Sequence, residues 1–487
     1  MYTIENDISF EQELSVKTAE LDSQRRVMMK HGVEITLQDI MVEHMESHGK
    51  ELNTLIMGKV SQRALQLQVA DIIVEATDGR VRVPHYAQKD DKSSVVWVYV
   101  GTHWEDIPDD QLFIDKIREA CRQMGLREDY CNDNLFGKKL RKQVEYMLSA
   151  YTCQPDNENV VLVNFLNGTL EISRDGAYHL RPHCREDFFR YVLPYQYDPH
   201  AQCPRFLRFL DEVLPDPDAQ KIILEYIASC FIKWLNNEKV LAFLGSGSNG
   251  KSVLLYVITQ MFGKENVAHE NIYDLTHDEV HRANIEGKLI NISTENAGKI
   301  RSDAFKTLAS GEPISCKRLY SQPYTMTVYA RQLLSFNDMP NIESSYATKR
   351  RWLPIKFEAR ISDEQADTEL GEKLVQELPG ILNLVLGVLP GLLERKKFSK
   401  SAAVDKVIQE LEYHNDPVQQ FVEDRCEPST VLTKGSELFK TFREFCDQNN
   451  CRRLSNQEFY HKLEEKYDSS PLDHQKAFYL RVARYED

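Results

Sequence analysis

Several common sequence features are missing from this chain of 487 residues, and each absence excludes a class of protein. The ten cysteines are scattered and form no Cys-x-x-Cys pair, so neither a zinc ribbon nor a dithiol redox motif is predicted. The longest apolar stretch, residues 381–393, is interrupted by Asn383, Gly387 and Pro390, so no membrane-spanning helix is expected. The first residues carry acids and lack the pattern of a secretory signal. Scattered thiols and no signal predict a cytoplasmic protein, in a bacterium or inside a host cell.

An excess of basic charge is also missing. The chain has 60 lysines and arginines against 75 acids, for a formal net charge of −15. This excludes a uniformly basic nucleic-acid coat, so contacts with nucleic acid must come from local basic features such as channel loops. Apolar residues make up 42% of the chain, which is enough for large cores, and the length predicts about three domains.

One glycine-rich stretch carries the most specific motif. An apolar run at 240–244, predicted as a buried strand, leads into Gly-x-x-x-x-Gly-Lys-Ser, and residues 253–262 are predicted as a helix. Strand, loop and helix are the context of a phosphate-binding loop, where glycines let backbone N–H groups approach phosphate oxygens. The predicted nucleotide-binding residues are Gly245, Ser246, Gly247, Ser248, Asn249, Gly250, Lys251 and Ser252.

The last two residues of this loop have the chemistry that ATP with Mg²⁺ requires. The ammonium group of Lys251 is placed to reach the β- and γ-phosphates, and the hydroxyl of Ser252 is placed to ligate Mg²⁺. The following helix directs its N-terminal N–H groups at the anion. The alternative is a glycine-rich turn that fits the spacing without binding nucleotide.

Hydrolysis needs further polar groups, and candidates follow in chain order. Residues 288–293 are predicted as a second strand, with Thr294 and Glu295 at its carboxyl end, where α/β sheets place ligands. Glu295 is the predicted acid that binds Mg²⁺ or activates water. Residues 331–336 are predicted as a third strand ending at Asn337, whose amide could contact the γ-phosphate or the lytic water. The alternatives are an acid favoured near a helix start and an ordinary turn residue.

Two basic clusters are candidates for contacts beyond the subunit's own nucleotide. In the run 349–351, either Arg350 or Arg351 could act as a finger at the γ-phosphate of a neighbouring subunit. Residues 311–330 predict a β-hairpin with a basic tip, which suits a single-stranded backbone and base stacking. A solvated basic face and an ordinary exposed hairpin are the alternatives. The expected DNA-binding residues of the tip are Lys317, Arg318 and Tyr320.

The predicted domains divide the chain into four parts. Residues 1–90 are predicted to be mostly helical, 91–200 to form a small α/β region with a β-meander at 159–180, 201–400 a helical lead-in and the ATPase core, and 401–487 a helix and a winged-helix domain. Residues 407–426 are predicted as one helix. The winged-helix prediction rests on a helix at 434–448, a second helix opened by the capping box at Ser455, and a basic strand. The alternative is an adaptor domain with a solvated basic face. Its candidate DNA-facing residues are Arg452, Arg453, Lys462, Arg481 and Arg484.

Taken in order, these motifs resemble the superfamily 3 helicases, and in particular the phage/plasmid and poxvirus primase–helicase family. The resemblance is dense over residues 200–400 and looser over 97–104, 164–168 and 416–487. It is carried by Gly245–Ser252, Ile292–Glu295, Phe305–Ile314, Ser335–Asn337 and Lys349–Pro354.

The resemblance implies an AAA+-like P-loop ATPase core that assembles into hexameric rings. Such rings translocate along single-stranded DNA and unwind fork DNA in replication of a phage, plasmid or integrated element. By motif position it implies ATP and Mg²⁺ at Lys251 and Ser252, Glu295 as the Walker-B glutamate and Asn337 as sensor 1. Two departures are Thr294, where an aspartate is usual, and the lack of an Asp-x-Asp pattern for a primase metal site. A primase is therefore expected only as a separate partner.

Three other functions are compatible with parts of this pattern. An origin-binding initiator or helicase loader would keep the ATPase without processive unwinding. A small-molecule kinase would use the phosphate loop alone, and a structural DNA-binding module would carry a degenerate ATPase. Stimulation of ATP turnover by single-stranded DNA separates the helicase from the kinase.

Overall fold

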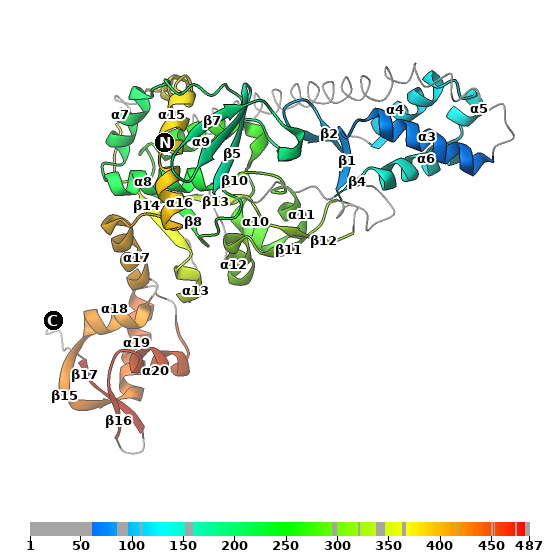
Figure 1. Cartoon of the computed structure of the whole chain (residues 1–487). Helices are drawn as coiled ribbons and strands as arrows, with labels where there is room; N and C mark the ends of the chain where they lie inside the picture. Colours follow the sequence, from blue (N-terminus) through cyan, green and yellow to red (C-terminus); the bar gives the residue numbers. More distant parts are fainter. Residues whose placement is uncertain are drawn as a thin grey trace, which may run out of the picture.

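The computed structural model describes residues 61–84, 96–107, 110–150, 159–294, 300–319, 322–337, 346–362, 367–414, 416–449, 451, 453–472 and 475–482. Figure 1 shows three parts: a helical unit at one end, a central body, and a C-terminal unit reached through helix α17. The domain boundaries at 90, 200 and 400 remain predictions. The hydrophobic clusters described below do not coincide with the boundaries at 90 and 200.

The first part is one hydrophobic cluster formed by residues between Leu65 and Leu148. Helices α3 and α6 pack along each other beside a small sheet of strand order β3-β2-β1-β4. The helices are α3 Gln62–Ala76, α4 Asp110–Gln123, α5 Glu128–Cys131 and α6 Asn134–Met147. The strands are β1 Val81–Pro84, β2 Trp97–Tyr99, β3 Trp104–Asp106 and β4 Ser149–Ala150.

The predicted β-meander is confirmed as three antiparallel strands. Its inward residues, among them Phe165 and Leu170, belong to the same hydrophobic cluster as the central body. The strands are β5 Val160–Phe165, β6 Gly168–Ser173 and β7 Tyr178–Arg181, followed by the 3₁₀ turn η3 Arg185–Asp187.

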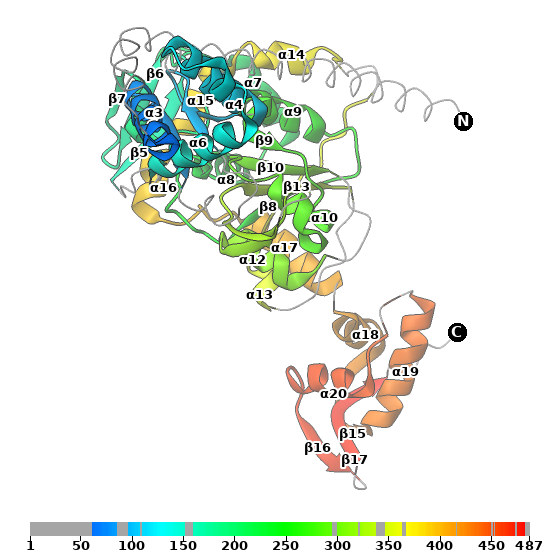
Figure 2. The same ribbon diagram turned by 90° about the vertical axis from the view of Figure 1, so that its right-hand side faces the viewer.

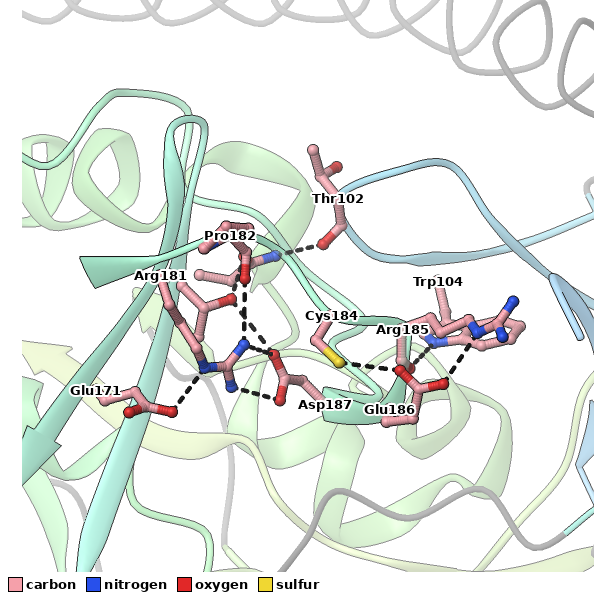
Figure 3. Close-up of polar contacts among 11 residues, drawn as sticks. Thr102, Trp104, Glu171, Arg181, Pro182, Cys184, Arg185, Glu186 and Asp187 are labelled. Carbon is pink, nitrogen blue, oxygen red and sulfur yellow. Dashed lines mark hydrogen bonds and ion pairs between the residues drawn. The ribbon is translucent and has the colours of Figure 1, made fainter. Parts of the chain in front are cut away.

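A polar cluster joins this meander to the first sheet (Figure 3). The guanidinium of Arg181 donates to both carboxylate oxygens of Asp187, at 2.7 and 2.8 Å, and to Glu171 at 2.6 Å. The indole N–H of Trp104 donates to the carbonyl of Arg185 at 2.8 Å. The bond of Trp104 and the bond from the amide of Asn164 to the carbonyl of Thr102, at 2.9 Å, connect the first unit to the meander, whereas the bonds of Arg181 lie within the meander and the turn after it.

The central body is built on a parallel sheet of order β14-β8-β13-β10-β9. Successive residues of β8 enter different clusters, with Leu241 and Phe243 on one face and Val240 and Ala242 on the other. A strand that is covered on both faces needs a nearly continuous apolar run, and this explains why every residue of 240–244 is apolar. The mixed α/β fold with a parallel sheet is confirmed. The strands are β8 Val240–Leu244, β9 Val267–Ala268, β10 Ile290–Thr294, β13 Arg331–Phe336 and β14 Trp352–Lys356.

Helices cover both faces of this sheet. On one face pack α7 Pro204–Val213, α8 Pro217–Ser229, α9 Lys251–Phe262, α14 Leu370–Val375, α15 Leu378–Gly387 and α16 Leu389–Arg395. On the other lie α10 Ile272–His277, α11 Glu279–Ala283, α12 Ser302–Ser310, α13 Tyr346–Lys349 and the hairpin of β11 Pro313–Cys316 and β12 Tyr324–Thr327. The hairpin that the sequence predicts is confirmed as an antiparallel pair.

One stretch among the described residues, Leu378–Arg395, is long and apolar enough to cross a membrane by length and composition. Half of it is buried, and in the structure it forms the two helices α15 and α16, which pack on α8. The interior of the body therefore accounts for its apolar character.

The C-terminal unit hangs below the central body in Figure 2. The predicted helix at 434–448 is confirmed, and so is the capping box of Ser455 with Glu458. The single helix expected over 407–426 is wrong: it is divided at Asp416, which caps a new helix with Pro417 in its first turn. The elements are α17 Ala402–His414, α18 Pro417–Arg425, β15 Cys426–Lys434, α19 Gly435–Gln448, α20 Asn456–Glu464, β16 Ser469–Leu472 and β17 Gln475–Val482, with sheet order β15-β17-β16.

Asp416 holds this unit together, and its substitution should destabilise it. The carboxylate accepts the N–H groups of Val418 and Gln419 and lies 3.1 Å from the ammonium of Lys462 and 3.5 Å from that of Lys466. We expect Asp416→Asn to lower the free energy of unfolding of the unit by about 1 kcal/mol at pH 7. Urea denaturation measures the loss, with Glu444→Gln on the exposed face of α19 as the control.

The pH dependence of this loss has a definite sign. Burial alone would raise the pKa of Asp416, but the charges of Lys462 and Lys466 hold it below its usual value. A depressed carboxyl pKa stabilises the fold above the pKa of the unfolded chain, and the stabilisation disappears as pH falls through the folded value. The difference between wild type and variant should therefore shrink below about pH 4. An unchanged difference at pH 3 would show that the charge of Asp416 is not what matters.

Candidate functional site

The loop between β8 and α9 folds tightly against its surroundings. A Cβ on Gly245 would lie 2.3 Å from the side-chain nitrogen of Asn249 and 2.6 Å from the carbonyl oxygen of Phe357. A Cβ on Gly250, which has φ +83°, would lie 2.6 Å from a methyl group of Val213. Only glycine fits these two positions, so the spacing of the motif follows from sterics.

The outer side of the same loop is open. Ser246, Gly247 and Ser248 are exposed, and no described atom lies within 4 Å of a Cβ placed on Gly247. Ser252, in the first turn of the 12-residue helix α9, is also exposed. An open loop that ends at a helix N-terminus is a site that fits an anion such as a phosphate chain.

Lys251 lies beneath this loop and is only 5% exposed. Its ammonium donates to the carbonyl of Gly245 and, at 3.2 Å, to the side-chain oxygen of Asn249. Desolvation lowers its pKa, and no carboxylate of the described residues pairs with it. A buried cation held by neutral oxygens is one that a bound anion would stabilise.

Polar residues that the sequence predicted separately meet at one edge of the sheet. The register pairs Leu244 with Phe336 and Thr294 with Ser335, so β8, β13 and β10 end side by side. The N–H of Gly245 donates to the carbonyl of Phe336 at 3.2 Å, which places Asn337 directly beside the loop. Thr294 and Asn337 are both exposed. Glu295, the predicted acid, follows Thr294 and lies outside the described residues.

Two segments that the sequence did not single out support the loop. The N–H of Ile361, beyond β14, donates to the carbonyl of Ser248 at 2.9 Å, and the carbonyl of Phe357 accepts from Asn249 at 3.4 Å. From the other side Val213 and Phe209 of α7 press on Gly250. No sequence signal identifies these contacts, because the partners lie far from the loop along the chain.

The structure separates the predicted arginines from this edge. Arg350 and Arg351 precede β14, whose Trp352 pairs with Val240 at the start of β8. The five residues of β8 place them about 15 Å or more from the subunit's own phosphate loop, at the opposite edge of the sheet. Arg351 is 7% exposed and donates to Ala347 at 2.6 Å, whereas the side chain of Arg350 is half exposed.

At the hairpin tip, one of the cations that the sequence suggested for DNA binding is paired with an acid. The guanidinium of Arg318 pairs with Glu286 at 2.8 Å, and the hydroxyl of Tyr324 donates to the same carboxylate oxygen at 2.7 Å. The backbone N–H of Lys317 donates to the backbone carbonyl of Glu279 at 2.9 Å, and Lys317 is half-buried. Tyr320 lies outside the described residues. Of the predicted DNA contacts, Arg318 is therefore already paired with an acid that partly neutralises its charge.

The basic residues predicted to face DNA in the C-terminal unit are similarly divided. Arg453 pairs with Asp447 and Lys462 with Asp416, whereas Arg481 is exposed on β17. Arg452 and Arg484 lie outside the described residues. Since these roles are untested, they stay predictions.

Comparison with known proteins yields matches along most of the chain. Residues 70–215 match the family described as D5 N terminal like, residues 243–351 a family of unknown function (DUF5906), and residues 413–480 the Poxvirus D5 protein-like family. A protein of Acanthamoeba polyphaga mimivirus named "Putative helicase L207/L206" is 23% identical over an alignment of 339 residues, and the match covers 62% of this chain and 34% of that protein. The chain thus spans about a third of this relative's length.

Solved structures share the fold over most of the chain. Two apo structures of the NrS-1 C terminal region align with TM-scores of 0.51, at 10% and 11% identity, over 86% of this chain and 99% of each of those chains. The order of motifs in the sequence agrees with three findings. D5-type families match on both sides of the phosphate-loop motif, one relative is named as a helicase, and solved structures share the fold. These findings support the similarity of the chain to the phage and poxvirus primase–helicase family of superfamily 3.

Proposed function

We propose that this protein is an ATP-dependent, ring-forming DNA helicase that translocates on single-stranded DNA and unwinds fork DNA in replication of a phage, plasmid or integrated element. The observation that carries the proposal is the placement of the polar groups on the sheet. The phosphate loop and Asn337 share one edge, while Arg350 stands half exposed at the opposite edge. Such a subunit is complete only when the opposite edge of a second copy meets its nucleotide.

The loop residues have distinct roles in this proposal. Lys251 exchanges its bonds to Gly245 and Asn249 for the β- and γ-phosphate oxygens of ATP. Ser252 and Glu295 would hold Mg²⁺, which would neutralise charge on the phosphates. The side-chain amide of Asn337 would donate a hydrogen bond to the γ-phosphate or orient the lytic water. The parallel sheet with β8 between β13 and β14 supports an AAA+-like P-loop core.

Contacts with DNA are proposed at two places. The hairpin of β11 and β12 carries Lys317 and Arg318 at its tip, with Leu319 exposed beside them. In a ring, these tips would line the channel and bind the single-stranded backbone. The C-terminal unit, with three helices and a three-stranded sheet, supports a winged-helix domain that contacts DNA through Arg481. A separate primase would supply primers at the same fork.

The test combines turnover with particle mass. We expect ATP hydrolysis by the full chain to rise several-fold with single-stranded DNA and to accompany a multi-subunit particle in mass photometry. Displacement of the second strand of a fork should depend on ATP and Mg²⁺. Turnover that ignores DNA in a particle that stays monomeric would refute the helicase proposal.

One observation favours a second function, that of an origin-binding initiator or loader. Arg318 of the basic tip is paired with Glu286, which weakens the attraction of the tip for the phosphates of single-stranded DNA. Such a protein would protect a defined duplex sequence from nuclease and would not displace strands beyond that site. A footprint on one duplex with no strand displacement would therefore decide for the initiator.

The pairing of Arg318 yields a prediction with an unusual sign. Because the negative charge of Glu286 partly neutralises Arg318 and repels a phosphate, Glu286→Gln should tighten binding of single-stranded DNA about threefold to tenfold at 0.1 M salt. Lys317→Ala should weaken it by a similar factor. Fluorescence anisotropy with labelled oligonucleotides measures both, and Glu444→Gln in the C-terminal unit is the control. If Glu286→Gln leaves the affinity unchanged, Arg318 is not a DNA contact.

A further inference from the structure

A single acid, Glu238, binds both arginines of the opposite edge. One carboxylate oxygen of Glu238 lies 2.7 Å from the guanidinium of Arg350 and 3.1 Å from that of Arg351. Two like charges on consecutive residues would otherwise repel each other, so the shared carboxylate holds them together. Neither the motif pattern nor the family matches give Glu238 a role.

The loop that carries Glu238 also holds the backbone of Arg350. The ammonium of Lys239 donates to the carbonyl of Arg350 at 2.6 Å, and the N–H of Val240 donates to the carbonyl of Arg351 at 2.7 Å. The pKa of Lys239 is lowered by desolvation and by the nearby charge of Arg350. Main chain and side chain of Arg350 are thus fixed by consecutive residues of one loop.

The loop is itself anchored and carries local strain. The N–H of Glu238 donates to the side chain of Asn236 at 3.1 Å, and Asn236 donates in turn to the carbonyl of Ser310 at the end of α12. Glu238 has φ +49°, a conformation that glycine adopts freely and other residues rarely do. Non-glycine residues in this region persist where the surrounding structure requires their side chain, often at functional sites.

The geometry leaves Arg350 able to bind a second anion. Its side chain is 51% exposed, and its recorded bond to Glu238 uses one of the five N–H donors of a guanidinium. Arg351, buried and bonded to Ala347 as well, serves as the fixed side of the cluster.

We infer that Glu238 is a positioning residue of the trans active site: it orients the Arg350 guanidinium toward the γ-phosphate bound by the neighbouring subunit. The inference rests on the proposed ring-forming ATPase, and it adds to that proposal a residue that acts through Arg350 without touching nucleotide. A misplaced finger costs rate and not nucleotide affinity, since the ATP contacts of the loop belong to the other subunit.

The expected kinetic signature is a loss of kcat at constant KM. With saturating single-stranded DNA, Glu238→Gln should lower kcat for ATP about tenfold to a hundredfold, with KM within twofold and particle mass unchanged. Glu128→Gln is the matched control, because Glu128 forms a comparable exposed pair with Arg122 at 3.2 Å in the first unit.

A second variant guards against misfolding. Glu238→Gly removes the carboxylate but suits the positive φ, so it should fold at least as well as the wild type and still lose kcat. Normal kcat in both variants would overturn the inference while leaving the proposed ATPase intact. A wild type without DNA-stimulated turnover would overturn the proposed function itself, and this inference with it.

Mixed rings separate positioning in trans from a structural role. Glu238→Gln subunits keep the phosphate loop, whereas Lys251→Ala subunits keep the Arg350 cluster. In an equimolar mixture, about a quarter of interfaces would combine an intact loop with an intact cluster. Turnover well above that of either variant alone supports the inference. Turnover no higher than the mean of the two variants overturns it.

Discussion

Replacing Lys251 with alanine should reduce ATP hydrolysis at least about 10²–10³-fold while leaving the fold intact. The ammonium group is buried beneath the loop, and within the described part of the chain it bonds to two neutral oxygens, those of Gly245 and Asn249. It therefore contributes little to stability without a ligand, because its desolvation offsets what these bonds gain. With ATP bound it would become the main cation of the subunit's own loop at the β- and γ-phosphates.

The measurement is steady-state ATPase activity with single-stranded DNA, beside thermal unfolding with and without nucleotide. Lys251→Met keeps the length of the side chain and removes its charge, so it should lose activity as the alanine variant does. Glu444→Gln, on the exposed face of α19 in the C-terminal unit, is the control and should retain turnover. Substantial hydrolysis by both lysine variants would contradict the assignment of the loop as the ATP site.

The parts of the fold that could be predicted are those set by local pattern. The strand at 240–244 is apolar at every position because both of its faces are covered, and the glycines after it are forced by contacts with Asn249 and Val213. The helix beginning after Ser455 was predictable because its cap is encoded within four residues.

Other elements carried no such pattern. Strand β15 contains Pro428 and exposed polar residues, and its ladder with β17 shifts register between Pro428 and Thr433. Strand β16, Ser469–Leu472, pairs only with β17 and is half exposed, so alternation of apolar and polar residues is weak. Edge strands of this kind are defined by their partners, which sequence reading along one segment does not reveal.

The candidate site shows the same limit. The placement of the loop beside Asn337 could be predicted because each follows an apolar strand, and parallel strands bring their carboxyl ends together. The acid Glu295 stays a prediction, since it lies outside the described residues. The ion pairs that decide which cations are available were not predictable. Glu238 lies 112 positions from Arg350, and Glu286 lies 32 positions from Arg318, so basic clusters that read as free are partly neutralised in the fold.

The two arginines of the opposite edge should therefore behave differently when each is replaced by alanine. Arg350 is half exposed, and its side chain pairs with Glu238 alone among the described residues, so Arg350→Ala should leave thermal stability within a few degrees of the wild type. Arg351 is buried, bonded to Ala347 and paired with Glu238, so Arg351→Ala should lower the melting temperature clearly.

The effect on catalysis should follow the reverse order once stability is accounted for. If Arg350 is the trans finger, Arg350→Ala should lower kcat about 10³-fold, with ATP binding and ring assembly retained. Nucleotide affinity, measured by a fluorescent ATP analogue, reports on the subunit's own loop and should not change. Arg350→Lys should restore only part of the rate, because a single ammonium cannot reproduce the planar donor pair of a guanidinium. If Arg350→Ala hydrolyses ATP normally and a folded Arg351→Ala particle does not, then Arg351 is the finger. If both variants hydrolyse ATP normally, neither arginine is the finger.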